Sequence, residues 1–245
     1  MIPPAGEKLG IFIRNLALLG LAFAWERGEM GQKLRPARDA ARIREVNSVW
    51  IDHAIIEDSD FDWMATIERL TLWNVKVPDG FLRRLQCLWW LDLRGGAAKD
   101  LKTISGISRL ECLIDNQVRG MADLSQLSSL AALRFLKLYG LAQISDLPSL
   151  ADLKSLERIE LGQMRNLRSI AHALDAPNLR ELLLSRRLNV TADDLVRING
   201  HARLEQFDWF AEDVPIKLWA SIAEAVKLPK ARAMHTADWF QSKGR

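Results

Sequence analysis

The sequence has 245 residues, about half of them hydrophobic (49%) and a quarter charged (27%), which is the composition of an ordinary soluble protein of one large or two small domains. Its 34 basic and 31 acidic side chains leave a net charge of +3, too small a surplus to indicate nucleic-acid binding without a basic cluster. Cys87 and Cys112 do not make a disulfide framework, and we expect both to remain thiols.

Residues 1–24 allow two interpretations. The apolar stretch Gly10–Trp25 is interrupted by polar residues, and its uninterrupted run is too short to span a bilayer. It is either a helix that covers the first of the repeats described below, or a secretory signal with Ala22-Phe23-Ala24 as its cleavage site. Pro36–Glu45 follows, with proline at the first position of a predicted helix. We therefore assign residues 1–45 to a helical N-terminal cap that includes this possible signal segment.

One apolar spacing recurs from Val46 onward. Within the stretch Leu133–Tyr139, the first, fourth and sixth places are taken by Leu133, Leu136 and Leu138. The same template begins again, in steps of 21 to 25 residues, at Val46, Ile67, Leu88, Leu110, Leu133, Leu156, Leu179 and Leu204. Of its 24 positions only Asp115 is not apolar. Eight near-regular copies predict a repeat protein in which each copy buries its apolar residues against its neighbours.

The L-x-x-L-x-L core and its period resemble the leucine-rich repeat family, and in particular its short bacterial, internalin-like repeats. The resemblance covers Val46–Phe210, about eight repeats. It implies an α/β solenoid: a horseshoe with a parallel β-sheet on the concave side, 3₁₀ or short helical turns on the convex side, and helical caps at both ends. Leucines spaced by three residues in the return segments also favour 3₁₀ turns.

The chain departs from the family at the asparagine that usually follows the third leucine. That position is occupied by Val75, Gly96, Val118, Leu141, Met164 and Arg187. The asparagine ladder that bonds the turn backbone is then missing, and we expect other groups to bond those amides. Asp115, a carboxyl on the leucine side of its strand, is expected to serve such amides, because an unpaired buried acid is costly.

Residues 211–245 follow the last repeat. Asp213-Val214-Pro215 predicts the start of a helix, and Pro229 its end. The apolar positions between them keep helical spacing: Ile216, Trp219, Ile222 and Val226. We expect this helix to cap the last repeat, while the pattern gives no place to Trp239-Phe240 in the basic tail.

The sequence contains no recognisable catalytic constellation. Its four histidines (His53, His172, His201 and His235) are scattered without metal-ligand spacing, and it has no glycine-rich phosphate loop or nucleophile elbow. We therefore expect a protein that is not an enzyme and that uses no cofactor or metal.

The residues between the leucines predict a binding surface. Strand side chains alternate, so with Leu136 and Leu138 inward, the residues beside them face out over the concave sheet. This face brings together aromatic and arginine side chains, the types that dominate binding hot spots. The candidate partner-binding residues are Trp50, Arg69, Trp73, Trp90, Asp92, Arg94, Ile114, Phe135, Lys137 and Tyr139.

These features predict a protein–protein interaction module, monomeric when unbound, with no nucleic-acid partner and no membrane span. A bacterial immunity protein that neutralises a toxin would suit such a dedicated surface. The alternative is a structural scaffold or a secreted or surface adhesion protein. We expect a cytoplasmic location, or export if residues 1–24 are a cleaved signal.

Overall fold

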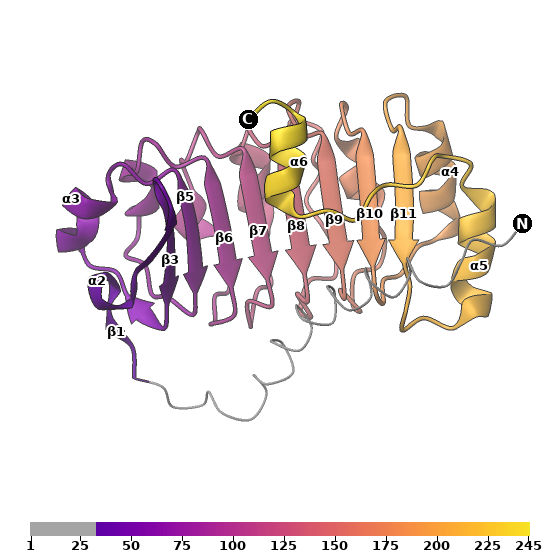
Figure 1. Cartoon of the computed structure of the whole chain (residues 1–245). Coiled ribbons are helices and arrows are strands. Elements are labelled where there is room, and N and C mark those ends of the chain that lie inside the picture. Colours follow the sequence, from indigo (N-terminus) through magenta and orange to yellow (C-terminus); the bar gives the residue numbers. More distant parts are fainter. Residues whose placement is uncertain (1–32) are drawn as a thin grey trace, which may run out of the picture. The chain divides into compact units, whose positions relative to one another are not determined.

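The computed structural model describes residues 33–245, so the segment in which we predicted a covering helix or a signal lies outside the described residues. Arg35–Arg245 forms one unit, and it is built on a nine-stranded sheet (Figure 1). Eight of its strands are parallel and follow one another in chain order: β3 (Ser48–Asp52), β5 (Arg69–Trp73), β6 (Trp90–Arg94), β7 (Cys112–Asn116), β8 (Phe135–Tyr139), β9 (Arg158–Gly162), β10 (Glu181–Ser185) and β11 (Gln206–Phe210). This is the solenoid of parallel strands, one per repeat, that the apolar spacing predicts.

The return segments lie behind the sheet and are short. Five of them contain 3₁₀ helices, as the leucine spacing predicts: Asp58–Asp60, Leu82–Arg84, Lys102–Ile104, Ser125–Ser129 and Ala171–Asp175. α3 (Phe61–Met64) continues the first of these. The return between β8 and β9 has the same leucine spacing at Asp146–Leu150 but forms no 3₁₀ helix. The return between β10 and β11 instead holds a full helix, α4 (Ala192–Gly200), which the repeat pattern did not predict. Its start is marked by a capping box in which Thr191 and Asp194 bond each other's backbone amides.

The core lies between the sheet and the return segments. Every template residue from Ile67 onward is buried except Leu93, which is half-buried. Because each coil contributes only a few leucines, burial depends on the coil before and the coil after. The first copy of the template is wrong at its first place: Val46 is 89% exposed, because it lies in the turn before β3.

The helix predicted over Pro36–Glu45 is also largely wrong. Only α2 (Ala37–Ala40) is helical, after a short strand β1 (Arg35–Pro36) that pairs with β4 (Ala54–Ile55). Ala41 is already extended, and β2 (Arg42–Glu45) then pairs antiparallel with β3 at the end of the sheet. Hydrogen bonding to an open sheet edge outweighs the helix propensity of these residues.

The turn amides are bonded by neighbouring coils rather than by an asparagine ladder. The first residue after each of seven successive strands has a left-handed backbone: His53, Asn74, Gly95, Gln117, Gly140, Gln163 and Arg186. The N–H of each donates to the carbonyl of the last residue of the next strand, as from Gln117 to Tyr139 at 2.8 Å. The expectation that other groups bond these amides is confirmed.

Asp115 does not have the role that we predicted. Its side chain is fully buried on the leucine side of β7, and neither carboxylate oxygen has a hydrogen-bond partner. In the sheet it lies between Leu93 and Leu138. Burial, and to a lesser degree the charge of Asp92, raises the pKa of Asp115 to about 7.

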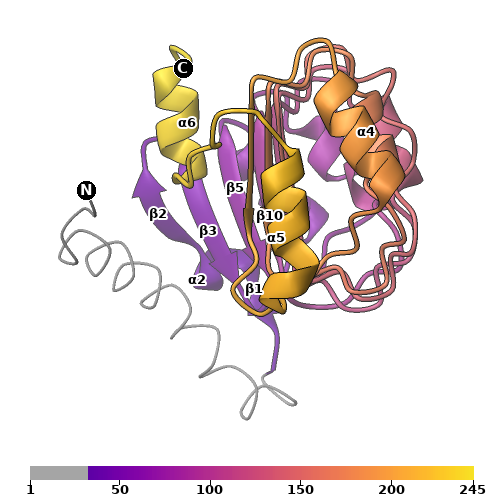
Figure 2. The same cartoon turned by 90° about the vertical axis from the view of Figure 1, so that its right-hand side faces the viewer.

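Two helices follow the last strand. α5 (Ile216–Ala225) begins after Pro215, as predicted, and Ile222 and Val226 join the main core. Ile216 is 73% exposed and is not part of the buried stripe. α6 (Thr236–Ser242) lies on the side of the sheet opposite α4 (Figure 2).

Candidate binding surface

The open face of the sheet, opposite the leucine core, carries all the candidate residues in three straight rows. Parallel pairing from β3 to β11 has no register shift, so equivalent positions lie side by side. The first row contains Arg69, Trp90 and Phe135; the second Trp50, Asp92, Ile114 and Lys137; the third Trp73, Arg94 and Tyr139. The predicted alternation of inward and outward residues is therefore confirmed.

The N-terminal third of this face holds a group that we call the aromatic patch: Arg44, Trp50, Trp73, Asp92 and Arg94. The rings of Trp50 and Trp73 lie 5.5 Å apart, and both are half-buried. The guanidinium groups of Arg44 and Arg94 lie 5.2 and 5.1 Å from the Trp50 ring. Both contacts are close enough for a cation–π interaction.

Asp92 fixes the position of Arg94. The Arg94 Nε donates to both carboxylate oxygens of Asp92 at 3.0 Å, and its terminal nitrogen donates to one of them at 2.7 Å. Asp92 is buried while Arg94 remains partly exposed. The guanidinium plane is thus held in place before any ligand arrives, which lowers the entropy lost on binding.

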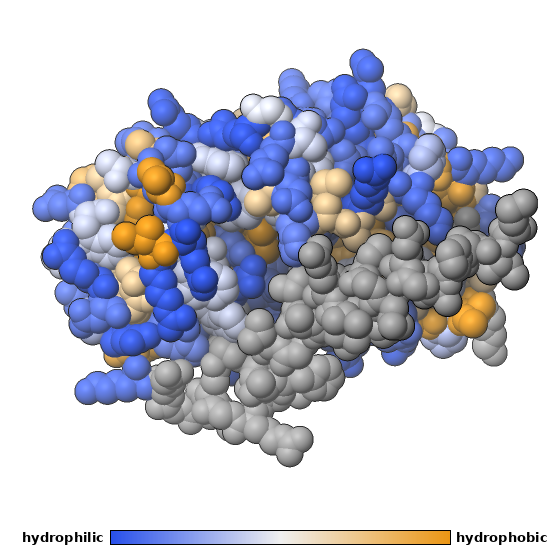
Figure 3. Space-filling view, in the orientation of Figure 1, coloured by the Kyte–Doolittle hydropathy of each residue, from blue (hydrophilic) through white to orange (hydrophobic). Residues whose placement is uncertain are grey.

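Exposed apolar side chains lie at the N-terminal end of the sheet. Figure 3 shows hydrophobic side chains at this end, among hydrophilic ones, and others at the opposite end of the molecule. Ile43, in β2, and Val46, in the turn after it, are more than four-fifths exposed. Arg69, at the border of the patch, pairs with Glu45 at 2.8 Å and lies 5.0 Å from the Trp90 ring.

The middle of the face is covered by α6. Three candidate residues, Trp90, Ile114 and Phe135, are buried there, and Phe135 has no exposed surface. They form a second apolar cluster, separate from the leucine core, with Cys112, Trp239 and Phe240. The sequence did not predict that the last two residues belong to this face. The available signal was an adjacent tryptophan and phenylalanine in the tail, outside the leucine template.

A network of buried charges follows the aromatic cluster along the sheet. Arg158, fully buried, donates to Glu160 at 2.9 and 2.6 Å and to Glu181 at 2.5 Å. Lys137, a candidate residue, pairs with Glu160 at 2.9 Å. Burial alone would raise the pKa of Glu160, but the charges of Lys137 and Arg158 and their hydrogen bonds keep it below its usual value.

Tyr139 is held across the sheet by its neighbour strand. Its hydroxyl donates to Gln163 at 2.7 Å, and its ring passes over Gly162. A β-carbon at Gly162 would lie 2.5 Å from the ring and 2.2 Å from the Ser185 hydroxyl. Glycine is thus required here by the ring above it, which uses the space that a side chain would fill.

Replacing Gly162 by alanine is expected to lower the free energy of unfolding by about 1–3 kcal/mol, because the Tyr139 ring must leave its position. Urea denaturation of the variant would measure this cost. The double variant Gly162→Ala, Tyr139→Ala should regain part of the loss, since the clashing ring is gone. Equal stability of the single variant and the parent would show that the ring is not held over Gly162.

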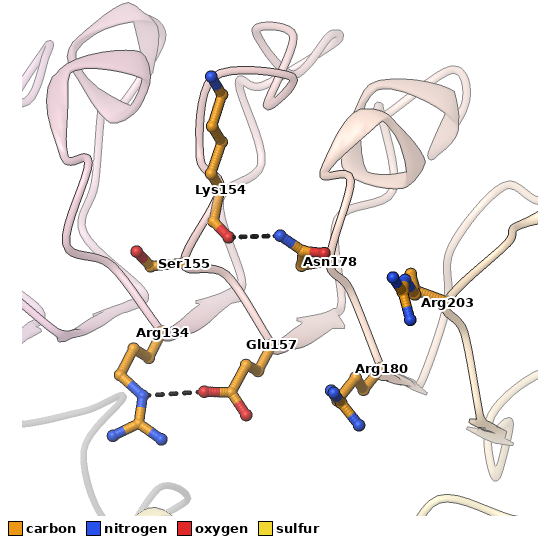
Figure 4. Close-up of a pocket in the computed structure, with 7 residues that line it drawn as sticks. All are labelled: Arg134, Lys154, Ser155, Glu157, Asn178, Arg180 and Arg203. Atoms are coloured by element: carbon orange, nitrogen blue, oxygen red, sulfur yellow. Dashed lines mark hydrogen bonds and ion pairs between the residues drawn. The ribbon is translucent and has the colours of Figure 1, made fainter.

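A hollow at the strand starts has a basic lining, and carboxylates neutralise part of its charge. Its volume is about 450 Å³, and Figure 4 shows its lining residues: Arg134, Lys154, Ser155, Glu157, Asn178, Arg180 and Arg203. Arg134 donates to Glu157 at 2.9 Å and Arg180 to Glu205 at 2.8 Å. These residues belong to a row in which glutamate and arginine alternate from coil to coil: Glu111, Arg134, Glu157, Arg180 and Glu205. We conclude that this hollow joins neighbouring coils and that two of its three arginines, Arg134 and Arg180, are engaged by carboxylates.

Among residues 33–245, no group of three or more histidine, cysteine, aspartate or glutamate side chains is placed to hold a metal ion. Within the same residues, no helix has the length and apolar character needed to cross a bilayer.

No protein-family model and no curated protein sequence matches this chain. Among solved structures, it is similar to the crystal structure of an internalin from Listeria monocytogenes, with 17% sequence identity and a TM-score of 0.41. The similarity covers 74% of this chain and 61% of the internalin chain, so the chain spans less than two thirds of that protein's length.

Proposed function

We propose that this chain is a non-enzymatic binding module whose protein partner contacts the aromatic patch. The observation that carries the proposal is the position of Arg94. Asp92 orients its guanidinium beside Trp50 on the open face of the sheet. Tryptophan and arginine held in this way are typical anchors of a protein interface.

Charge around the patch supports a protein partner over a nucleic acid. Arg94 is paired with Asp92, and Arg69 is paired with Glu45. A surface that follows a phosphate backbone would carry cations without such acids among them. Mixed charge beside aromatic rings instead suits a folded protein surface with its own acids and bases.

The partner class that we propose first is a toxin, which would make this chain a bacterial immunity protein located in the cytoplasm and monomeric when unbound. A preformed, dedicated patch supports this choice. The alternative is a scaffold or a secreted adhesion protein, which Ala22-Phe23-Ala24 would support as a cleavage site. The intact mass of the protein from its source cells separates these classes, because cleavage after residue 24 removes the preceding segment.

The solenoid itself needs protected ends to serve as a stable platform. We propose that α5 closes the end beyond β11, since Ile222 and Val226 pack into the core there. Residues 1–45 would close the other end of the predicted horseshoe, with the open face on its concave side.

Replacing Trp50 or Arg94 by alanine is expected to weaken partner binding by at least about 2 kcal/mol, roughly thirty-fold in Kd, because each removes a preorganised anchor. The partner is first isolated by affinity purification from the source organism with mass spectrometry, and binding is then measured by calorimetry. Circular dichroism should show an unchanged fold.

Lys102→Ala and Lys154→Ala serve as controls, because both lysines are exposed on return segments away from the open face. Their affinity should equal that of the parent. Full-strength binding by both patch variants would place the interface elsewhere and remove the basis of the proposed function.

A further inference from the structure

The last fifteen residues, Ala231–Arg245, form what we call the C-terminal segment. Its helix α6 lies in front of the middle strands of the sheet in Figure 1, on the open face rather than among the return segments. Within the helix, Trp239 and Phe240 are each 1% exposed. The segment is therefore anchored by two adjacent aromatic side chains.

These two side chains fill what we call the aromatic socket: Trp89, Trp90, Cys112, Ile114 and Phe135. The Phe240 ring lies 5.1 Å from Trp89, 5.7 Å from Trp90 and 6.2 Å from Phe135. The Trp239 ring lies 5.4 Å from Phe135, edge to face. Such geometry is favourable for aromatic pairs beyond the area they bury.

Two carboxylates of the solenoid complete the fit. The indole N–H of Trp239 donates to both oxygens of Glu181 at 3.1 Å, and Lys243 pairs with Glu181 at 3.1 Å. Arg245 pairs with Glu111 at 2.6 Å and stacks 4.3 Å from the Trp89 ring. Cations after the aromatic pair are thus matched by acids on the sheet.

The C-terminal segment packs on the outside of the solenoid and is not part of its leucine core. The socket residues form a cluster of their own, and no residue of α6 belongs to the leucine core. The charges beneath it also pair with one another, Arg158 with Glu160 and Glu160 with Lys137. Removal of the segment would therefore expose apolar rings but break no leucine packing.

Ten residues without helix or strand, 226–235, join α5 to α6. The Phe207 backbone bonds Pro229 and Ala231, and Arg158 donates to the Arg232 carbonyl at 2.8 Å, so the part that can move with α6 begins after Arg232. α6 has only seven residues, too few for a stable helix by itself in water, so its helical form depends on docking. Docking and folding of the segment are then one equilibrium.

We propose that the C-terminal segment is an intramolecular ligand of the aromatic socket, displaced when a partner brings a short helix of the same chemistry: two adjacent aromatic residues followed within about a turn by a cation. This inference rests on the proposed binding function and adds a second, covered part to its surface. The tether gives the segment an effective concentration of about a millimolar, so a partner helix must exceed that competition. The apparent affinity of the socket for the partner helix is the intrinsic affinity multiplied by the fraction of molecules in which the socket is open.

Cys112 provides a direct probe of opening in the full wild-type chain. Its thiol is fully buried in the socket, whereas Cys87 is exposed and serves as an internal control. A thiol reagent with mass-spectrometric detection should label Cys112 through local opening, at a rate that depends only weakly on urea. Trp239→Ala should raise that rate at least ten-fold, while Gln241→Ala, at an exposed position of the same helix, should leave it unchanged. Labelling of Cys112 that follows global unfolding alone, with the full urea dependence, would overturn the proposal.

A second experiment tests the ligand chemistry. A fluorescein-labelled peptide with the sequence 231–245 is titrated with the wild-type chain and with the full-length double variant Trp239→Ala, Phe240→Ala. The variant should bind the peptide at least ten-fold more tightly, because its own segment no longer competes. A control peptide with alanine at both aromatic positions should bind neither protein, and Glu181→Gln in the variant should weaken binding of the native peptide.

Two results would contradict the proposal that the segment is an intramolecular ligand. The first is a folded double variant that does not bind the peptide. The second is a double variant that does not fold, since the segment would then be part of the structural core. Neither experiment uses the partner or the aromatic patch. A negative result in either experiment therefore leaves the proposal for the aromatic patch intact. Likewise, full-strength partner binding by the Trp50 and Arg94 variants would not affect the conclusion on the C-terminal segment.

Discussion

Replacing Asp115 by leucine is expected to raise the free energy of unfolding at pH 8 by about 2–4 kcal/mol. The substitution removes a fully buried carboxyl without hydrogen-bond partners and restores the apolar residue that the other coils have at this place. Urea denaturation of both proteins at several pH values measures the effect. A leucine variant less stable than the parent at pH 8 would show that the carboxylate has partners.

The pH dependence of the parent tests the same point. Burial raises the pKa of Asp115 to about 7 in the folded protein, whereas an unfolded aspartate titrates near 4. The folded state therefore holds the extra proton between these values, and the free energy of unfolding falls as pH rises from about 4 to about 7. Three pKa units correspond to on the order of 4 kcal/mol. Asp115→Asn keeps the shape without the charge, so this component of the pH dependence should vanish in that variant.

Leu136→Ala is expected to lower the free energy of unfolding by about 2–5 kcal/mol, through lost burial and the cavity left between coils. Leu136 is fully buried in β8, between Leu113 and Ile159 on the neighbouring strands. Lys154→Ala, at an exposed position of the following return segment, should cost less than about 0.5 kcal/mol in the same urea titration.

Lys137→Ala is a sharper control for the register. From the alternation alone, its cost should stay under about 0.5 kcal/mol, but Lys137 pairs with the buried Glu160. We therefore expect about 1 kcal/mol, between the values for Lys154 and Leu136. A loss at position 137 equal to that at 136 would contradict the assignment of inward and outward faces.

The solenoid could be predicted from the sequence because its determinants are local and repeated. Leucine spacing specifies strand, turn and inward face in every coil, and a fixed period aligns the strands without further information. The prediction of secondary structure failed in the segments that do not follow the repeat spacing. Arg42–Glu45 becomes a strand only because β3 offers an open edge, and nothing within those residues encodes that edge.

The sequence predicted which residues form the three rows of the open face, but it did not predict which of them are covered by α6. Phe135 and Trp239 meet across a separation of about a hundred residues, and no periodicity relates them. The sequence did hold a coarse signal, because both sides of the contact are aromatic and lie outside the leucine template. That these aromatic residues pack against each other can be recognised only from the structure.

The fate of Asp115 could not be predicted for a different reason. Its inward position followed from the template and is confirmed, but partners for a carboxyl depend on individual atoms of the surrounding backbone. Here the neighbouring coils bond their own amides to each other, so none remains for the side chain. A rule that buried acids are paired describes most proteins and fails at this residue.

The alternating charges at the strand starts limit how the solenoid can change in length. Glu111, Arg134, Glu157, Arg180 and Glu205 repeat every two coils, although the leucines repeat every coil. Deletion of a single coil within this stretch would bring two like charges together, whereas deletion of two consecutive coils would join opposite charges again. Each exposed pair contributes only about 0–1 kcal/mol, but a mismatch reverses its sign. A change in the number of coils along this row therefore preserves the charge pairing only when coils are removed or added in pairs.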